Sequence, residues 1–448
     1  MKKMEGYILT ALALTGYLSC KKPFSPRLAS VTTNFLAVDG PILSGDSTII
    51  TLSRTTSLND TTQQKAELKA IISVENDQGT LYPFTEKGKG VYTLGVTNFS
   101  AARQYRLDIK TTDGKIYQSD FVPMKVTPPI DSIYFKQNSA ATVLIYVNSH
   151  DPTNNTRYYR WDYKETWSYV PLYQAFYEYK NGQFLPIVPD SPDAINICYE
   201  NDLSNQIFIG SSAKLAQDVI ANQQLGGLAN GSANIGHVYV MQLRQYALTQ
   251  DGFNYYQNLQ TNTENLGSIF DAQPSTTIGN IHCITSPTDM VIGYVSASTV
   301  TTKQFNLHHN DLQISAPDPY GDIAWLPAGQ FNYARYYSSY YFPPPDTPVC
   351  HYGSFKNYDD QLGVLLPVAT FNAIVTADLG AASGNLMVDE VFPVANVPPL
   401  PPNPNPNPMP PYIPAYAIIY YYAPKACVDC RLKGGTNIRP SYFPLPAY

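Results

Sequence analysis

The side chains best able to do chemistry are the six cysteines and six histidines, and their spacing fits none of the common catalytic motifs. The chain has no G-x-S-x-G nucleophile elbow, no phosphate-binding loop and no H-E-x-x-H zinc motif. The one local cluster is His308-His309 with Asp311. Adjacent residues of a strand point to opposite faces, so these histidines are a poor shared metal site. We therefore predict a chain that is not an enzyme and that holds no metal or other cofactor.

The cysteines beyond position 20 are odd in number: Cys198, Cys283, Cys350, Cys427 and Cys430. Cysteines in an oxidising compartment form disulfides by default. We expect Cys427 and Cys430 each to bond to Cys198 or Cys283, which would attach the C-terminus to the middle of the chain. Cys350, in a Tyr/Pro-rich stretch, is then the thiol left over. The alternative is a local Cys427–Cys430 redox bridge; such pairs begin helices, whereas this one follows the strand-like run Ala415–Tyr422.

Cys20 determines where the chain folds. A basic start is followed by Tyr7–Leu18, an apolar run of twelve residues, and by small Ser19 directly before Cys20. This order is typical of a secretory signal peptide, and the run is shorter than the roughly 20 residues of a membrane-spanning helix. A cysteine at this place predicts a lipoprotein signal, although Tyr17 stands where Leu is usual. Residues 1–19 would be removed and Cys20 acylated; plain secretion is the alternative.

The composition is that of an exported, β-rich protein. Charged residues make up only 14%, below the usual quarter, whereas tyrosine alone supplies 36 positions and proline 37. The formal net charge is −6, and no Lys/Arg cluster follows Lys22, which excludes a typical nucleic-acid-binding surface. Attachment to a lipid bilayer would depend on the acylated Cys20. One acyl chain anchors only marginally, so stable attachment needs several.

The fold class predicted is mainly β with a few helices. Residues 20–29 form a tether, and residues 30–126 have the pattern of an immunoglobulin-like β-sandwich. Short runs of strand type alternate there with turn signals such as Asp113-Gly114. The predicted strands are Asn34–Val38, Ser47–Leu52, Leu68–Val74, Leu81–Thr85, Val91–Leu94, Tyr105–Thr111 and Lys115–Phe121. Pro123, Pro128 and Pro129 then mark a domain boundary.

Residues 130–448 are expected to form a larger β-rich α+β domain. Strands are predicted at Gly236–Tyr246, Asn280–Thr285 and Val291–Ser298, and helices at Ala213–Ala221 and Thr249–Leu266. Thr249 is a suitable helix cap and Gly267 a stop. An insertion rich in Tyr and Pro covers about 317–414 and includes the proline tract Val397–Pro414, interpreted as a stiff exposed loop or as a docking ligand for an aromatic groove.

Two groups of aromatic residues are candidates for ligand contact. Tyr159 and Trp161 lie in the alternating run Arg157–Tyr163, and Tyr336 and Tyr337 lie in the Tyr-rich insertion. For the first run, rings that pack inward from a half-buried strand are the simpler interpretation. The sharper hypothesis is a platform for a sugar or a peptide.

Several stretches resemble a large Bacteroidota family of outer-membrane lipoproteins whose domain has no assigned function. They are Ile207–Ile220, Arg244–Thr249, Asn262–Asp271, Gly279–Cys283, Ile292–Ser298 and Cys427–Gly435. The resemblance covers about Ser30–Leu312 and Ala415–Phe443. It implies a lipid anchor, an N-terminal sandwich and frequent encoding beside a TonB-dependent receptor, and it brings no catalytic residues. The family's cysteine positions match Cys198, Cys283, Cys427 and Cys430, but not Cys350.

The resemblance leads us to expect a non-catalytic outer-membrane lipoprotein that serves a TonB-dependent transporter as an accessory or ligand-capture partner. Lys21-Lys22-Pro23 lacks the acidic residues that often follow the lipidated cysteine of surface-exported relatives, so both the periplasmic and the cell-surface side stay open. The alternatives are a secreted hydrolase acting on glycans or peptides, with paired carboxylates distant in sequence, and a structural or adhesive surface protein.

Overall fold

A computed structural model gives the fold of the chain. The structure describes residues 34–56, 65–138, 142–169, 197–229, 232–264, 279–312, 431 and 435–444, together with the backbone of strands at 177–180, 183–186, 353–356, 358–359, 364–365, 387–393 and 418–423. The signal peptide, Cys20, the tether, Cys350, Tyr336, Tyr337, the proline tract, Cys427 and Cys430 lie outside the described residues. Among those described, no helix is both long and apolar enough to cross a membrane.

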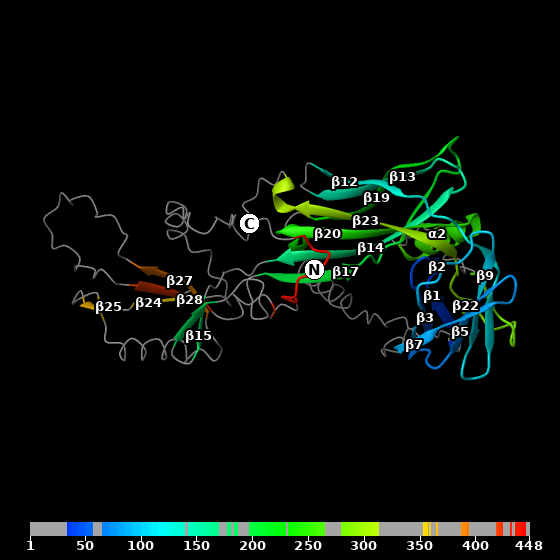
Figure 1. The fold of residues 1–448 in the computed structure, drawn as a ribbon, viewed down its shortest axis with the longest axis horizontal. Coiled ribbons are helices and arrows are strands. Elements are labelled where there is room, and N and C mark those ends of the chain that lie inside the picture. The colour runs from blue at the N-terminus through cyan, green and yellow to red at the C-terminus, as the bar shows by residue number, and fades with distance from the viewer. Residues whose placement is uncertain are drawn as a thin grey trace, which may run out of the picture.

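The first β-sandwich consists of two six-stranded sheets (Figure 1). One sheet has the order β22 (Val291–Ile292), β1 (Leu36–Asp39), β3 (Thr48–Arg54), β8 (Val91–Leu94) and β7 (Thr85–Gly88), with β4 (Lys65–Ala66) beside β3. The other has the order β21 (Ile281–Cys283), β10 (Ile116–Ser119), β9 (Gln104–Lys110), β5 (Ile71–Asn76) and β6 (Leu81–Pro83), with β11 (Val122–Pro123) beside β9. Every second residue of β3, β5 and β9 is buried, so these strands supply the core.

A second sandwich follows, and its layers have three and six strands. The small sheet has the order β12 (Ile130–Gln137), β13 (Val143–Asp151) and β19 (Asp218–Leu228). The large sheet has the order β17 (Cys198–Leu203), β14 (Tyr158–Tyr169), β20 (Val238–Ala247), β23 (Ala297–His308) and β2 (Ile42–Ser44), with β18 (Phe208–Ser211) beside β14. Its core combines aliphatic side chains of β13 with large aromatic ones of β14 and β20, among them Ile145, Trp161 and Tyr239.

Three chain segments cross side by side from one sandwich to the other. β1 pairs in parallel with β22, and directly afterwards β2 pairs in parallel with β23. The third segment joins at Lys125, whose N–H donates to the Ala297 carbonyl at 3.0 Å and whose carbonyl accepts from the Thr299 N–H at 2.9 Å. The two sandwiches are therefore joined by backbone hydrogen bonds as well as by the chain itself.

The predicted fold class is confirmed, since the described chain is mainly β and begins with a sandwich. All seven strands predicted within residues 30–126 are present, and the Asp113-Gly114 turn joins β9 to β10. The first sandwich also includes β21 and β22, two strands from residues 281–292 that the sequence had assigned to the second domain. Two-residue edge strands such as β22 carry too little pattern to reveal their partner.

One of the two predicted helices is confirmed and the other is wrong. α2 (Gln250–Thr263) begins at Thr249, whose side chain accepts from the Gly252 N–H as a helix cap. Residues 213–221, by contrast, enter strand β19, which pairs with β13. Of the apolar residues of this run, Leu215 and Val219 are exposed and Ile220 is buried, in keeping with the alternation of a strand. A run this short fits the period of a helix and that of a strand, and its pairing with β13 makes it a strand. Two 3₁₀ turns, η2 (Ala233–Ile235) and η3 (His309–Asp311), flank β20 and β23.

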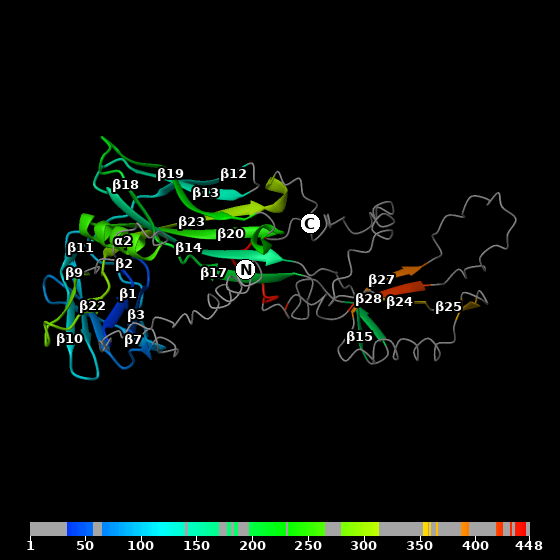
Figure 2. The ribbon, with the colours of Figure 1, turned by 180° about the vertical axis from the view of Figure 1, so that it is seen from behind.

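Two small sheets involve the Tyr/Pro-rich stretch. A five-stranded sheet has the order β16 (Gln183–Pro186), β15 (Tyr177–Lys180), β27 (Met387–Pro393), β28 (Ile418–Ala423) and β24 (Gly353–Lys356), and a hairpin pairs β25 (Tyr358–Asp359) with β26 (Val364–Leu365). Figures 1 and 2 both draw the five-stranded sheet at the opposite end of the molecule from β1–β11. The stretch about 317–414 therefore contains strands β24 to β27, which the sequence analysis did not predict.

The loop after β13 is held by Asp151, which is buried beside the crossing segment. Its carboxylate accepts hydrogen bonds from Thr153 N–H and Oγ1–H, Asn155 N–H and Thr156 N–H at 2.6–3.0 Å. Thr156 Oγ1 in turn donates to the Val126 carbonyl at 3.2 Å. Burial alone would raise the pKa of Asp151, but these hydrogen bonds lower the pKa to about 2.

We predict that Asp151 stabilises the fold in a pH-dependent way. Its folded pKa is below the unfolded value of about 3.9, so its contribution is fully present above about pH 4 and is lost as the pH falls through about 2. The difference in urea unfolding midpoint between the wild type and Asp151→Asn should therefore shrink over that interval. The exposed Asp202→Asn should show no such trend. The prediction would be contradicted if the difference in unfolding midpoint between the wild type and Asp151→Asn were the same at about pH 4 and at about pH 2.

A second prediction concerns Gly293, which lies between the crossing segments. Its φ is +141°, and a Cβ placed there would approach the Val38 carbonyl oxygen to 2.2 Å. Gly293→Ala should therefore lower the free energy of unfolding by about 2 kcal/mol or more. Gly95 has an ordinary φ and open space around it, so Gly95→Ala should change the free energy by less than about 0.5 kcal/mol. Chemical denaturation measures both, and equal effects would contradict the prediction.

Candidate ligand-binding site

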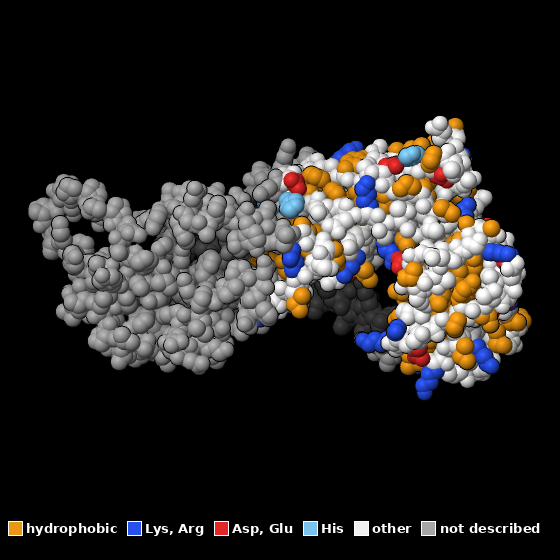
Figure 3. Space-filling view, in the orientation of Figure 1, with side chains coloured by type: hydrophobic (Ala, Val, Ile, Leu, Met, Phe, Trp, Pro, Cys, Tyr) orange, Lys and Arg blue, Asp and Glu red, His pale blue; other side chains and the backbone are white. Residues whose placement is uncertain are grey.

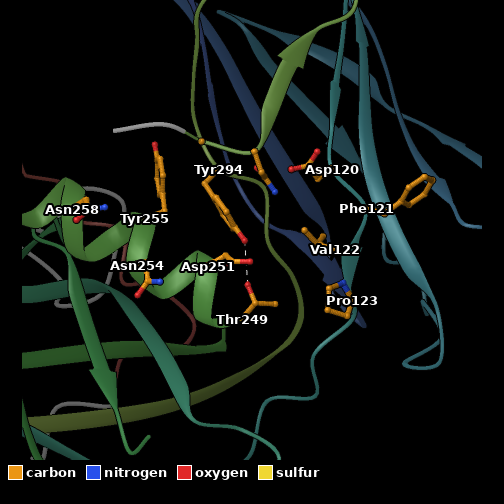
Figure 4. Close-up of a pocket in the computed structure, with 12 residues that line it drawn as sticks. Asp120, Phe121, Val122, Pro123, Thr249, Asp251, Asn254, Tyr255, Asn258 and Tyr294 are labelled. Atoms are coloured by element: carbon orange, nitrogen blue, oxygen red, sulfur yellow. Dashed lines mark hydrogen bonds between the residues drawn. The ribbon is translucent and has the colours of Figure 1, made fainter. Parts of the chain in front are cut away.

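A cavity of about 340 Å³ lies where the first sandwich, α2 and the return segment before β23 meet (Figure 4). Its walls are Asp120, Phe121, Val122, Pro123, Thr249, Asp251, Asn254, Tyr255, Asn258, Gly279, Asn280 and Tyr294. Pockets between two bodies are common sites for small ligands, and this volume is at the lower end of the usual range of about 300–1,000 Å³.

Four side chains of α2 reach the cavity because of their helical spacing. Asp251, Asn254, Tyr255 and Asn258 stand at i, i+3, i+4 and i+7, which places them on one face. Asp251 lies in the first turn, where the helix dipole favours a negative charge. The side chains of Asp251, Asn254 and Asn258 have no hydrogen-bond partner among the described residues, so their polar groups are free for a ligand.

Two stacked tyrosines form the wall between α2 and the return segment. The Tyr255 and Tyr294 ring centroids are 5.3 Å apart at an interplanar angle of 29°. Figure 4 shows their hydroxyls pointing in opposite directions, with that of Tyr294 directed at Thr249, 3.1 Å away. Tyr255 is 7% exposed, and its hydroxyl has no partner among the described residues. Burial raises the pKa of Tyr255 to about 12, which keeps this hydroxyl protonated at neutral pH.

The opposite wall comes from the first sandwich and includes the carboxylate of Asp120. Asp120 lies 3.2 Å from His282 Nε2, and both side chains are exposed. Asn280, which also lines the cavity, is buried, and its side-chain amide donates to the Val295 carbonyl at 2.9 Å and accepts from the Val295 N–H at 2.8 Å. Asn280 therefore shapes the cavity and keeps the return segment in place.

The charge of the cavity is negative. Its twelve lining residues include two carboxylates and no Lys, Arg or His. The described residues contain no group of three or more His, Cys, Asp or Glu able to hold a metal ion. The cavity is therefore suited to ligands with hydrogen-bond donors and positive charge.

An arginine held between two tyrosines fixes α2 to the large sheet. The Arg160 guanidinium lies 4.8 Å from the Tyr246 ring centroid and 4.9 Å from that of Tyr256, which belongs to α2. It also donates to Tyr256 Oη and to Asp162 Oδ2, each at 3.1 Å. At the other end of α2, Gln260 donates to the Ile207 carbonyl at 2.6 Å. These contacts determine where the polar face of α2 points.

The aromatic residues predicted to contact a ligand do not do so where the structure describes them. Tyr159 and Trp161 are 0% and 1% exposed, and their rings stack in the core of the second sandwich. Tyr159 Oη donates to Asp218 at 2.7 Å, and Trp161 Nε1 donates to Gln245 at 2.8 Å. The ligand-platform hypothesis for this run is wrong, and the simpler interpretation of inward-packed rings is confirmed. Tyr336 and Tyr337 lie outside the described residues.

The cysteine prediction is wrong at one position. Cys283 is a buried free thiol on β21 and forms no disulfide. Cys198 is disulfide-bonded, and its partner lies outside the described residues. The pairing of Cys198 with Cys427 or Cys430 stays a prediction. Asp311 of the histidine cluster accepts from the His308 N–H at 2.9 Å, so this carboxylate caps η3.

Sequence reasoning missed the cavity because its walls are far apart in the chain. The spacing of Asp251, Asn254 and Asn258 was a usable signal, since it marks one polar face of a predicted helix. The other wall, at Asp120, follows only from the packing of the first sandwich against α2.

We predict that Arg160→Ala destabilises the protein by about 2–4 kcal/mol, because it removes two cation–π contacts and leaves Asp162 without its guanidinium partner. Arg160→Lys keeps the charge but not the planar stacking, so its free energy of unfolding should lie between those of the wild type and Arg160→Ala. The exposed Arg103, 3.5 Å from Asp77, is the matched control, and its removal should cost less than about 1 kcal/mol. Chemical denaturation gives the free energies; equal losses for Arg160→Ala and Arg103→Ala would refute the role assigned to Arg160.

Comparison with solved structures finds similarities at low sequence identity. The chain is similar to a two-domain fibronectin type-III segment of chicken tenascin (10% identity, TM-score 0.15, 48% of this chain and 90% of that one). It is also similar to native E. coli alpha-2-macroglobulin (10% identity, TM-score 0.16, 50% of this chain and 14% of that one). A third similarity is to the BSP domain of a biofilm-associated protein (9% identity, TM-score 0.15, 66% of this chain and 66% of that one). Identities and TM-scores of this size carry no functional inference.

Comparison with sequence families gives a clear result. No curated protein matches the chain. Residues 21–304, which are more than half of the chain, match a domain of unknown function, DUF4249. The span includes both sandwiches almost to the end of β23, and thus all the walls of the cavity. The chain belongs to the DUF4249 family.

Proposed function

We propose that the protein is a non-catalytic outer-membrane lipoprotein, anchored by acylated Cys20, that captures a ligand for a TonB-dependent transporter. The observation that carries the proposal is the cavity between the two sandwiches, which presents unengaged polar side chains on a firmly joined frame. A binding site of this kind loses little conformational entropy when it is filled.

The signal sequence supports export and anchoring. An apolar run of twelve residues and then a small residue is the order of a secretory signal peptide, and the cysteine that follows favours a lipoprotein signal, although Tyr17 stands where Leu is usual. DUF4249 membership begins at residue 21, directly after that cysteine. The family match therefore begins next to the residue at which the chain would begin after cleavage.

The exposed surface supports contact with a protein partner. Several large apolar side chains of the first sandwich are exposed, including Ile71 at 71% and Ile284 at 52%. Ile71 lies beside Lys110 of β9, and Ile284 donates its N–H to the Ile116 carbonyl of β10, so these residues belong to one sheet. Figure 3 shows hydrophobic side chains spread over the visible face of the first sandwich, with Lys and Arg at its rim. Exposed apolar groups within a polar rim are typical of docking surfaces.

We predict that native protein extracted from membranes in mild detergent brings down a large β-barrel receptor, because the anchor and the apolar face of the first sandwich hold the two together. Affinity purification followed by mass spectrometry measures this. Recovery of no outer-membrane receptor from cells grown under several nutrient conditions would contradict the transporter partnership.

Substitutions at two cysteines provide the control. Cys20→Ala should move the protein from the membrane fraction to the soluble fraction and should abolish the mass increment of acylation on intact-mass analysis. Cys350→Ser changes a cysteine that the lipoprotein signal does not use, and should leave fractionation unchanged. A Cys20→Ala protein that stays in the membrane fraction would count against the lipid anchor.

A further inference from the structure

The first sandwich has a distal end, away from the second sandwich, and the described chain begins there. β1 runs from Leu36 toward the junction, so Asn34 precedes it at the distal end (Figure 1). The strand pairing places four connections at this end: residues 67–70 before β5, 87–90 between β7 and β8, 111–115 between β9 and β10, and 284–290 between β21 and β22. These connections and the strand ends that they join form one surface.

The distal end carries the positive charge of the first sandwich. All six lysines within residues 34–124 belong to it: Lys65, Lys69, Lys87, Lys89, Lys110 and Lys115. Lys115 lies 2.5 Å from Asp289, and the other five are exposed and form no ion pair among the described residues. With Arg54, seven basic side chains face four described acidic ones (Glu67, Glu86, Asp113 and Asp289), which gives a net charge of +3. The whole chain carries −6, so the distal end differs in sign from the rest.

Two of these lysines stand at turn positions that favour other residue types. Lys69 and Lys89 have φ values of +58° and +52°, in the left-handed region that Gly, Asn and Asp adopt most easily. A lysine there strains the backbone, and its ammonium group forms no ion pair with the described chain in return. Strain without a benefit to the fold is an indication of function.

Large apolar side chains are exposed among these lysines. Four of them are exposed by 45–71%: Leu68, Ile71, Ile284 and Met290. Ile71 lies opposite Lys110, and Lys110 lies opposite Ile116, whose carbonyl accepts from the Ile284 N–H. Leu68 precedes Lys69 directly. Apolar groups interspersed with lysines suit the boundary between phospholipid headgroups and acyl chains, where a lysine can keep its charge in water above a buried apolar stem.

The start of the described chain favours a lipid surface as the partner of this end. Asn34 follows Cys20 by fourteen residues, which span at most about 50 Å when fully extended. An acyl group on Cys20 therefore holds the distal end close to the bilayer at a high effective concentration, so that weak attraction is sufficient for contact. Lys21 and Lys22 add two positive charges directly beside the lipid.

We propose that the distal end of the first sandwich rests on a bilayer that contains anionic phospholipid, with its exposed apolar side chains among the headgroups and its lysines against lipid phosphates. This inference rests on the acylation of Cys20 in the proposed function. It gives the anchored protein an orientation in which the second sandwich points away from the bilayer. The sheet face that includes Ile71 then borders the membrane in which a β-barrel receptor is embedded.

Tryptophan fluorescence of the acylated full chain in vesicles tests this orientation. Leu68→Trp and Met290→Trp place reporters at the distal end, and Val96→Trp is the control, because Val96 is 67% exposed at the opposite end of the same sandwich. The wild-type emission is subtracted. In vesicles of phosphatidylethanolamine and phosphatidylglycerol, brominated phospholipid should quench about half or more of the emission added at positions 68 and 290, because interfacial side chains lie about 5–10 Å deep. The emission added at position 96 should persist.

Lipid charge and salt test the role of the lysines. Quenching of Leu68→Trp should fall in vesicles of phosphatidylcholine alone and as NaCl is raised, since both changes weaken the electrostatic attraction. Lys87→Glu, added to the Leu68→Trp chain, should lower the quenching in the same way. Lys214→Glu makes the same charge change on an exposed lysine of the second sandwich and should not. Thermal midpoints check that each variant is folded.

Two results would overturn the proposal. Equal quenching at positions 68, 290 and 96, or quenching at none of them, would remove the orientation. Quenching of Leu68→Trp that is the same in phosphatidylcholine, in high salt and with Lys87→Glu would remove the contact with anionic lipid.

The vesicle experiment and the receptor pull-down fail independently, provided that intact mass shows the acyl group on the chain used. Quenching in vesicles, with no receptor recovered, would remove the transporter partnership and support the orientation. An acylated chain without quenching would keep the anchor and remove the orientation. If the tryptophan at position 68 then became buried only on addition of a recovered receptor, the distal end would belong to that protein and the lipid contact would be overturned.

Discussion

The parallel pairing of three distant chain segments between the sandwiches is the constraint on which the rest of the structure depends. Neighbouring domains in one chain ordinarily move relative to one another unless their interface is large. Here the residues that follow β1, β11 and β22 run side by side, with Lys125 bonded to the backbone on both sides of Ser298. Bending at this point would break a hydrogen-bonded ladder. The junction therefore acts as a continuation of the sheets.

Everything that shapes the cavity is attached to that junction. The wall at Asp120 precedes one crossing segment, and the wall at Tyr294 precedes another. α2 is the third wall, and it depends on Arg160, whose guanidinium is stacked on two rings and paired with Asp162. Charged residues make up only 14% of this chain. We expect the Arg160–Asp162 ion pair to determine the position of α2 more than to add net stability. The carboxylate of Asp251 is the contrast: it has no hydrogen-bond partner among the described residues, and it supports α2 only through the helix dipole.

Local patterns were sufficient for the local part of the fold. Alternation and turn residues located the strands of the first sandwich, and Thr249 with its following spacing located α2. What the sequence could not supply was long-range pairing. β2 leaves the first sandwich for the second, and β21 and β22 return to the first from residues 281–292. These strands have two or three residues each, too few to show a period, and only their partners make them strands.

The aromatic residues show the same limit at the level of the site. Tyr159 and Trp161 alternate with polar residues, a pattern that suits both a binding platform and a core. The choice was made by Asp218 and Gln245, acceptors on β19 and β20 that meet these rings only in the folded sheets. A buried aromatic residue whose polar atom is satisfied by the chain is part of the framework. By the same criterion Tyr294, whose ring is buried and whose hydroxyl lies 3.1 Å from Thr249 Oγ1, also belongs to the framework, although it lines the cavity.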